Sequence, residues 1–99
     1  MDIRIKATKI ELTDKIKDYF QEKMDMLEKY LGNTPVINCD CEVEKVAEQN
    51  SGKIYRAEVN LSVPGDLLRV DKTEKDLFKA IDKVKDHLAE MIKKYKETR

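Results

Sequence analysis

The sequence predicts an α+β fold in which the elements follow the order β-α-β-β-β-α and both helices pack on one face of a four-stranded sheet. Apolar residues recur at every second position in four short segments, as in half-buried strands, and at every third or fourth position in two longer segments, as in amphipathic helices. The polar strand residues need water on one side, so the helices are expected to cover the other. With 99 residues, we expect one domain, residues 1–99.

The first strand and the first helix are expected in the N-terminal third. Ile3 and Ile5 alternate with basic residues, which predicts a short strand. Thr13 is a suitable N-cap for a helix over about residues 14–31, and Gly32 is expected to stop it. The apolar positions that predict this helix are Ile16, Tyr19, Phe20, Met24, Leu27 and Leu31.

Three more strands are expected in the middle of the chain. Residues 37–44 and 55–63 alternate between apolar and polar side chains, and a polar loop over residues 48–52 separates them. Residues 63–66 fit a tight turn because proline presets its φ angle and glycine accepts a positive one. The chain then returns as a fourth strand over residues 67–70.

The last helix is expected to follow a capping box formed by Thr73 and Asp76 and to continue to about residue 96. Its length is predicted from apolar residues at helical spacing, namely Leu77, Ile81, Val84, Leu88, Ile92 and Tyr95.

The composition narrows the classes of function. Twenty basic residues balance twenty acidic ones, so a nucleic-acid partner would have to be bound by segregated charge. The sequence has no apolar run long enough to span a membrane, and its N-terminus lacks the apolar core of a signal peptide. We therefore expect a cytoplasmic protein with no membrane partner.

Catalysis and bound cofactors are not expected. The sequence contains no Gly-rich phosphate loop, no Ser/His/Asp set and no cluster of metal ligands, so we predict a non-enzymatic protein without a small-molecule substrate. Cys39 and Cys41 lie two positions apart on a predicted strand and point to the same side. We interpret them as reduced residues of the core, and His87 as a surface residue of the last helix.

The charged residues of the two helices differ in sign. The first helix carries an acidic row at Asp14, Asp18 and Glu22. The last helix also carries a row of like charges at i, i+4 spacing. In either row, repulsion between neighbouring like charges destabilises the helix by roughly 0.2–0.5 kcal/mol per pair. The row on the last helix consists of Lys75, Lys79, Lys83 and His87, and Lys94 extends it. An anionic partner would explain the row, and a solvated face with intrahelical ion pairs to Asp82, Asp86 and Glu90 is the alternative.

The aromatic residues favour one mode of recognition. Tyr19, Phe20, Tyr55, Phe78 and Tyr95 fall at or beside core positions, and none clearly belongs to the polar face of the sheet. Proteins that stack bases on a sheet need such a platform. We therefore predict that any RNA is recognised by its shape and through its phosphates.

Three segments resemble the ribosome hibernation-promoting factors, a family also known as sigma-54 modulation proteins or ribosome-associated inhibitors. Residues 10–13, 22–24 and 27–30 resemble its first helix, residues 64–69 its third hairpin, and residues 76–82, 86–88 and 92–96 its last helix. The resemblance implies a fold similar to double-stranded RNA-binding domains. It also implies binding to the small ribosomal subunit and its ribosomal RNA near the decoding site, where messenger and transfer RNA would be blocked and translation silenced under stress.

The resemblance also implies which residues contact RNA. The matching basic positions are Lys23 and Lys29 on the first helix and Lys79, Lys83, Lys93, Lys94 and Lys96 on the last. Together with Lys75 and His87 from the lysine row, they form the predicted RNA-binding set. His87, Glu90 and Met91 stand where the family often has basic or amide residues, which thins the basic face.

Two further expectations concern partners. Long family members continue into a dimer-forming domain, whereas this sequence ends at Arg99, so we expect a monomer. A protein–protein adaptor that modulates the transcription machinery is the alternative function, with the acidic first helix and the open sheet face as its surface.

Overall fold

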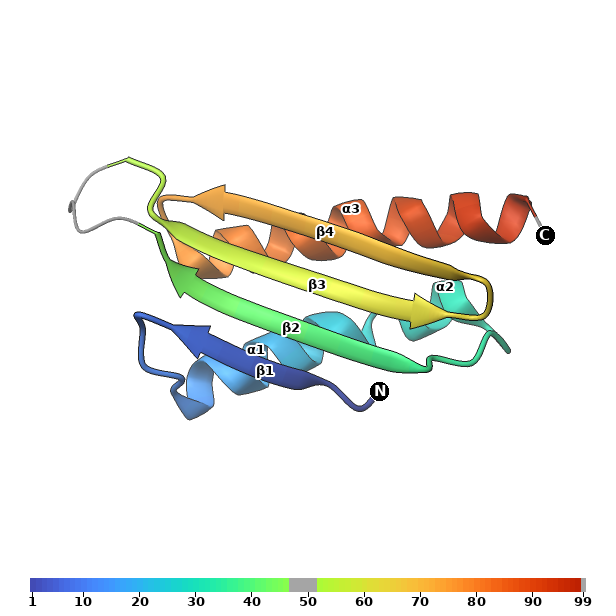
Figure 1. The fold of residues 1–99 in the computed structure, drawn as a ribbon, viewed down its shortest axis with the longest axis horizontal. Coiled ribbons are helices and arrows are strands. Elements are labelled where there is room, and N and C mark those ends of the chain that lie inside the picture. The colour runs from blue at the N-terminus through green and yellow to red at the C-terminus, as the bar shows by residue number, and fades with distance from the viewer. Residues whose placement is uncertain (47–51, 99) are drawn as a thin grey trace.

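The computed structural model describes residues 1–46 and 52–98 and consists of two layers, a sheet and a set of helices (Figure 1). The strand order is β1-β2-β3-β4, with β1 parallel to β2 and the other neighbours antiparallel. The helices all lie behind one face of the sheet, which confirms the predicted α+β fold. The strands are β1 (Arg4–Thr8), β2 (Asn38–Lys45), β3 (Tyr55–Val63) and β4 (Asp66–Glu74), and the helices are α1 (Asp14–Asp25), α2 (Glu28–Leu31) and α3 (Leu77–Glu97).

The prediction of one continuous helix over residues 14–31 is wrong, because the helix is interrupted between the end of α1 and the start of α2. The backbone N–H of Leu27 donates to the carbonyl of Met24 at 3.0 Å, a tighter turn than that of an α-helix. This turn keeps Leu27 fully buried although the helix is interrupted. The N-cap and the stop are confirmed: the Thr13 hydroxyl accepts from the Ile16 N–H at 3.2 Å, and Gly32 caps α2 at φ 57°.

The predicted boundary between the last strand and the last helix is also wrong. Thr73 pairs with Arg56 inside β4, so it does not cap a helix. The cap is Asp76, whose carboxylate accepts from the Phe78 N–H at 2.9 Å. The tight turn at Pro64–Gly65 is confirmed, with Gly65 at φ 81°. The predicted polar loop lies outside the described residues apart from Gly52.

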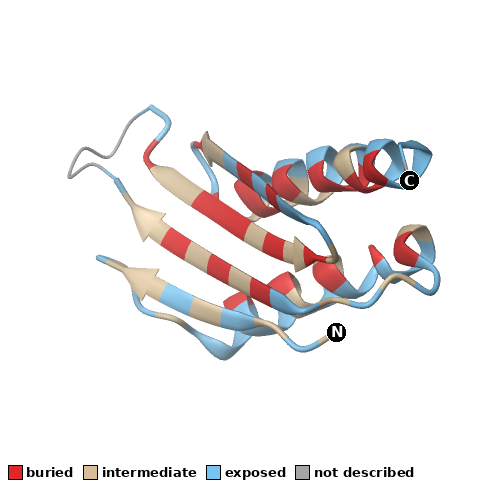
Figure 2. Cartoon of the chain, turned by 45° about the vertical axis from the view of Figure 1, so that its right-hand side comes forward, coloured by how far each residue is buried: buried red, intermediate tan, exposed pale blue. Residues whose placement is uncertain are grey.

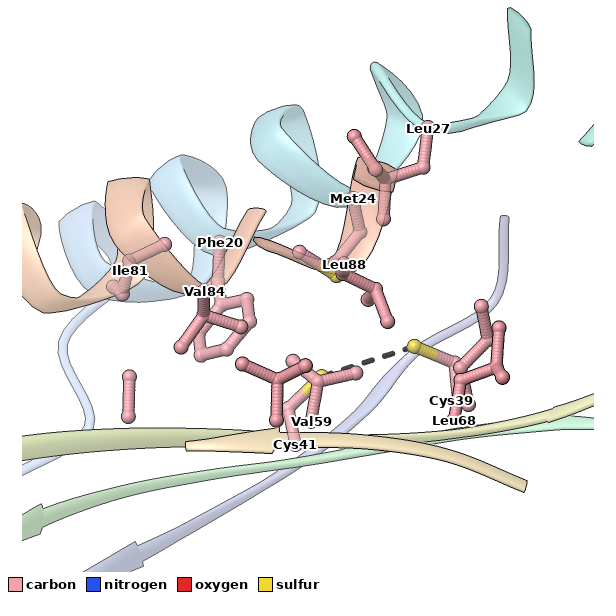
Figure 3. Packing of buried hydrophobic residues seen from close by; sticks show 14 of the residues in the cluster. Phe20, Met24, Leu27, Cys39, Cys41, Val59, Leu68, Ile81, Val84 and Leu88 are labelled. Atoms are coloured by element: carbon pink, nitrogen blue, oxygen red, sulfur yellow. Dashed lines mark hydrogen bonds between the residues drawn. The ribbon is translucent and has the colours of Figure 1, made fainter. Parts of the chain in front are cut away.

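The core lies between the helices and the sheet, and buried residues alternate with less buried ones along β2 (Figure 2). Figure 3 shows Phe20 and Met24 from α1 and Val84 and Leu88 from α3 above the strand residues. Cys39 and Cys41 are buried and free, as predicted, with their sulfur atoms 3.9 Å apart. Strand β2 begins one residue later than predicted, at Asn38, and Ile37 is 60% exposed.

The open face of the sheet carries a network of ion pairs. The Arg56 guanidinium lies within 3.5 Å of carboxylates on three strands, which belong to Glu42, Glu44, Glu58 and Asp71. Glu58 is buried and also accepts from Arg69 at 2.7 Å. These carboxylates are therefore largely neutralised by arginine within the fold, and an incoming cation would have to compete with those arginines.

Candidate nucleic-acid interface

The surface where α1 and α2 meet α3 gathers lysines and aromatic rings. We call this surface the helix seam. The helix seam is formed by Lys15, Tyr19, Lys23, Lys29, Tyr30, Phe78, Asp82, Lys85 and Lys93. Its residues come from the flanks of the two apolar stripes, because packing two helices side by side on a sheet brings one flank of each together.

The N-terminal part of the helix seam is built on two rings. Tyr19 and Phe78 meet edge to face, with ring centroids 4.9 Å apart and planes at 87°. Lys15 lies 5.3 Å from the Phe78 centroid, and Lys23 lies 5.1 Å from the Tyr19 centroid. Each half-buried ring therefore holds an ammonium group of α1 at the surface.

Asp82 connects the two helices at this point. Its carboxylate accepts a hydrogen bond from the Tyr19 hydroxyl at 2.6 Å and lies 3.5 Å from the Lys23 ammonium. The hydrogen bond to Asp82, together with burial, raises the pKa of Tyr19 to about 12. Asp82 thus fixes the positions of Tyr19 and Lys23, but it also neutralises part of the positive charge there.

The C-terminal part of the helix seam is centred on Tyr30. The ammonium groups of Lys29 and Lys93 lie 5.1 and 5.0 Å from the centroid of its ring. Lys93 also pairs with the exposed Glu90 at 3.1 Å. Lys85 pairs with Asp86 at 2.7 Å, and this contact, with a smaller contribution from Tyr30, raises the pKa of the Lys85 ammonium.

Of the predicted RNA-binding residues, the structure brings Lys23, Lys29 and Lys93 together on the helix seam. The others lie elsewhere. Lys83 pairs with Glu74 of β4 at 2.8 Å, which places that flank of α3 toward the sheet edge. The remaining members of the predicted row, Lys79, His87 and Lys94, are exposed on the outward and β4 sides of α3.

Two predicted RNA-binding residues do not belong to the row of exposed lysines on α3. Lys75 precedes the N-cap of α3 and is exposed, so the row of like charges on the helix begins only at Lys79. The Lys96 ammonium donates to the carbonyl of Leu31 at 3.2 Å, at the end of α2, where this carbonyl also accepts from the Thr34 N–H at 3.0 Å. Lys96 therefore joins the ends of α2 and α3.

Sequence reasoning missed Lys15 and Lys85. Each lies beside the apolar stripe of its own helix, where a lysine usually extends over the core edge. The helical spacing of the apolar residues could not indicate which flank of one helix faces the other helix. The residues beside the stripes, taken from both helices together, were the only available signal.

The helix seam can bind an extended anion that also offers flat surfaces. Lysine ammonium groups bind phosphates, and exposed aromatic rings stack on bases. Within the described residues, no three His, Cys, Asp or Glu side chains are placed to hold a metal ion. The described part of the chain also contains no helix long and apolar enough to cross a membrane.

The fold and the helix seam define a small α+β domain that presents lysines and aromatic rings along the contact between its helices. The chain belongs to the family described as sigma 54 modulation protein / S30EA ribosomal protein, whose model matches residues 3–99. This confirms the resemblance found in the sequence.

Individual relatives agree with this assignment. The chain is 29% identical over 93 residues to the ribosome hibernation promotion factor of Deinococcus radiodurans, a match over 94% of this chain and 48% of that protein. It is 27% identical over 97 residues to the ribosome hibernation promoting factor of Pseudomonas putida, covering 98% of this chain and 88% of that one. The chain thus spans about half the length of the Deinococcus relative.

Solved structures show the same fold. The N-terminal domain of Thermus thermophilus Protein Y matches with a TM-score of 0.81 and 30% identity, over 96% of this chain and 99% of that one. A ribosomal subunit interface protein from Coxiella burnetii matches with a TM-score of 0.77 at 17% identity, which supports the fold alone.

Proposed function

We propose that this chain binds the small ribosomal subunit, places its helix seam on ribosomal RNA near the decoding site, and silences translation in the cytoplasm during stress. The observation that carries the proposal is the gathering of five lysines and three aromatic rings on one surface of a chain whose net charge is zero. The names of the Deinococcus and Pseudomonas relatives support the link to ribosome hibernation.

The charge balance of the helix seam favours an anionic partner. Three of the five lysines there, Lys23, Lys85 and Lys93, pair with carboxylates, which belong to Asp82, Asp86 and Glu90. Lys15 and Lys29 form no ion pair with any described residue, so binding a phosphate would not require breaking one. Phosphates would release their own counterions, which makes such contacts favourable at low salt.

The mechanism is steric and requires no catalysis. The folded body would occupy the path of messenger and transfer RNA while the lysines hold it on the ribosomal RNA. We propose that the chain acts as a monomer. Because it offers one RNA-binding surface, it would not bridge two ribosomes by itself.

The adaptor function is the second candidate, and the observation in its favour is the phrase "sigma 54 modulation" in the family description. Its surface would be the open sheet face and the acidic side of α1. The arginine pairs of Arg56 and Arg69 neutralise much of the sheet face, which makes it the weaker candidate.

The test is binding of purified small subunits by a variant that carries Lys29→Gln and Lys93→Gln. The loss of two phosphate contacts should weaken association roughly tenfold and reduce the salt slope by about 2. The matched control carries Lys6→Gln and Lys17→Gln, which remove the same charge from the open sheet face and from the outer side of α1. Equal loss in both variants, or in neither, would contradict the assignment of the surface.

A further inference from the structure

We propose that Tyr30 is a stacking position for an unpaired RNA base, which replaces a lysine ammonium over the ring while the displaced lysine binds the adjacent phosphate. This inference rests on the proposed function and deepens it, because it names the part of the RNA that the C-terminal half of the helix seam binds.

The surroundings of Tyr30 match the chemistry of a nucleotide. A nucleotide offers one flat base and one phosphate, and here one ring lies within about 5 Å of two ammonium groups, those of Lys29 and Lys93 (5.1 and 5.0 Å). The ring is half-buried and packs against the core, so it is held in place before any ligand arrives. A rigid ring loses little conformational freedom on binding, which favours stacking.

The exchange of an ammonium for a base is favourable in both of its parts. A cation over an exposed ring is a weak contact because water solvates the ammonium well. Base–aromatic stacking is stronger, and it tolerates any of the bases because each has a flat face. The freed lysine remains tethered beside the ring, within reach of the phosphate that precedes or follows the stacked base.

Tyr19, the other tyrosine of the helix seam, is not arranged in this way. Phe78 packs edge to face against its ring, and its hydroxyl is held by Asp82 at 2.6 Å. The carboxylate of Asp82 would also repel a phosphate placed there. Around Tyr30, by contrast, no carboxylate of the described residues is hydrogen bonded to the hydroxyl; Glu90 pairs with Lys93 at 3.1 Å, Lys29 forms no ion pair with a described residue, and a third ammonium, that of Lys85, interacts with the ring.

Stacking predicts a binding energy with two separable parts. The lysines contribute a part that weakens with salt, because phosphate contacts release counterions. The ring contributes a part that does not depend on salt, since stacking involves no net charge. A change at Tyr30 should therefore alter the affinity at every salt concentration and leave the salt slope unchanged.

The experiment compares Tyr30→Leu with wild type for binding to purified small subunits over a range of salt. We expect an affinity about tenfold lower with the slope unchanged, and we expect Tyr30→Phe to restore wild-type affinity because it keeps the ring. Tyr55→Leu is the matched control, since Tyr55 is half-buried on β3 outside the helix seam. Wild-type affinity for Tyr30→Leu would overturn the inference, whereas failure of the wild type to bind would overturn the proposed function itself.

A measurement on the unaltered protein covers the case in which Tyr30→Leu does not fold. The wild-type complex is crosslinked with ultraviolet light, and the attached nucleotides are located by mass spectrometry. A nucleotide on Tyr30 supports the inference, and nucleotides found only on other residues overturn it.

Discussion

Under the proposed function, Asp82 has opposite effects on stability and on RNA binding. It joins α1 to α3 through Tyr19 and Lys23, and it places a negative charge among the lysines of the helix seam. The sequence offered Asp82 as a partner in intrahelical ion pairs, but the observed partners Tyr19 and Lys23 lie on the other helix. Long-range partners of this kind cannot be derived from the spacing within one helix.

We predict that Asp82→Asn lowers the pKa of Tyr19 from about 12 toward its ordinary value of 10.0, because the charged acceptor that stabilises the protonated phenol is lost. The same change should tighten RNA binding by releasing Lys23. The tyrosine titration can be followed by nuclear magnetic resonance of the ring carbons. Asp86→Asn is the control, because it also removes a carboxylate but has no contact with Tyr19; a Tyr19 titration that stays unchanged in Asp82→Asn would contradict the account.

At the scale of elements, alternation and helical spacing predicted the strands and helices well but placed several ends wrongly. The break between α1 and α2 was missed because Met24, Leu27 and Leu31 keep helical spacing across it. The end of β4 was placed too early because Lys72 and Thr73 are polar, although β3 pairs with them. The tight turn at Leu27 interrupts the helix without changing the apolar spacing, and the end of β4 is decided by its pairing with β3, which is not visible in a local pattern.

The candidate site shows the same limit. Sequence reasoning predicted Lys23, Lys29 and Lys93 from the family resemblance, and these three lysines lie on the helix seam. It also predicted that the row at Lys79 and Lys83 binds RNA, because an anionic partner would explain why these charges repel each other. The structure shows that Lys83 has a structural partner in Glu74, which makes its place in that row understandable without RNA.

The junction of β4 and α3 provides a prediction about pH. Glu74 is buried and paired with Lys83 at 2.8 Å, and this hydrogen bond lowers the pKa of the Glu74 carboxyl from its ordinary value of 4.5. A lowered pKa means that the stabilisation is present above the ordinary value and is lost as the pH falls through the folded value.

Replacing Glu74 by Gln should therefore lower the melting temperature at pH 7 and reduce the difference in melting temperature between pH 7 and about pH 3. Thermal melts followed by circular dichroism measure both. Glu11→Gln, at an exposed position before α1, serves as the control. A melt of Glu74→Gln that keeps the full wild-type dependence on pH would show that the pair with Lys83 does not stabilise the fold.

For the whole molecule, the central feature is that a chain without net charge separates its charges by surface. Lysines lie along the helix seam, acidic residues lie on the outer side of α1, and arginine–carboxylate pairs cover the open sheet face. Such separation allows a phosphate-binding surface without the cost in self-repulsion that a strongly basic chain bears.

The salt dependence of binding to purified small subunits tests this account most directly. If four or five lysines of the helix seam neutralise phosphates, a plot of log affinity against log salt should be linear with a slope of about −3 to −4.5. A slope near zero, with binding otherwise intact, would contradict the account, because it would mean that the chain is held by apolar or protein contacts and not by its lysines.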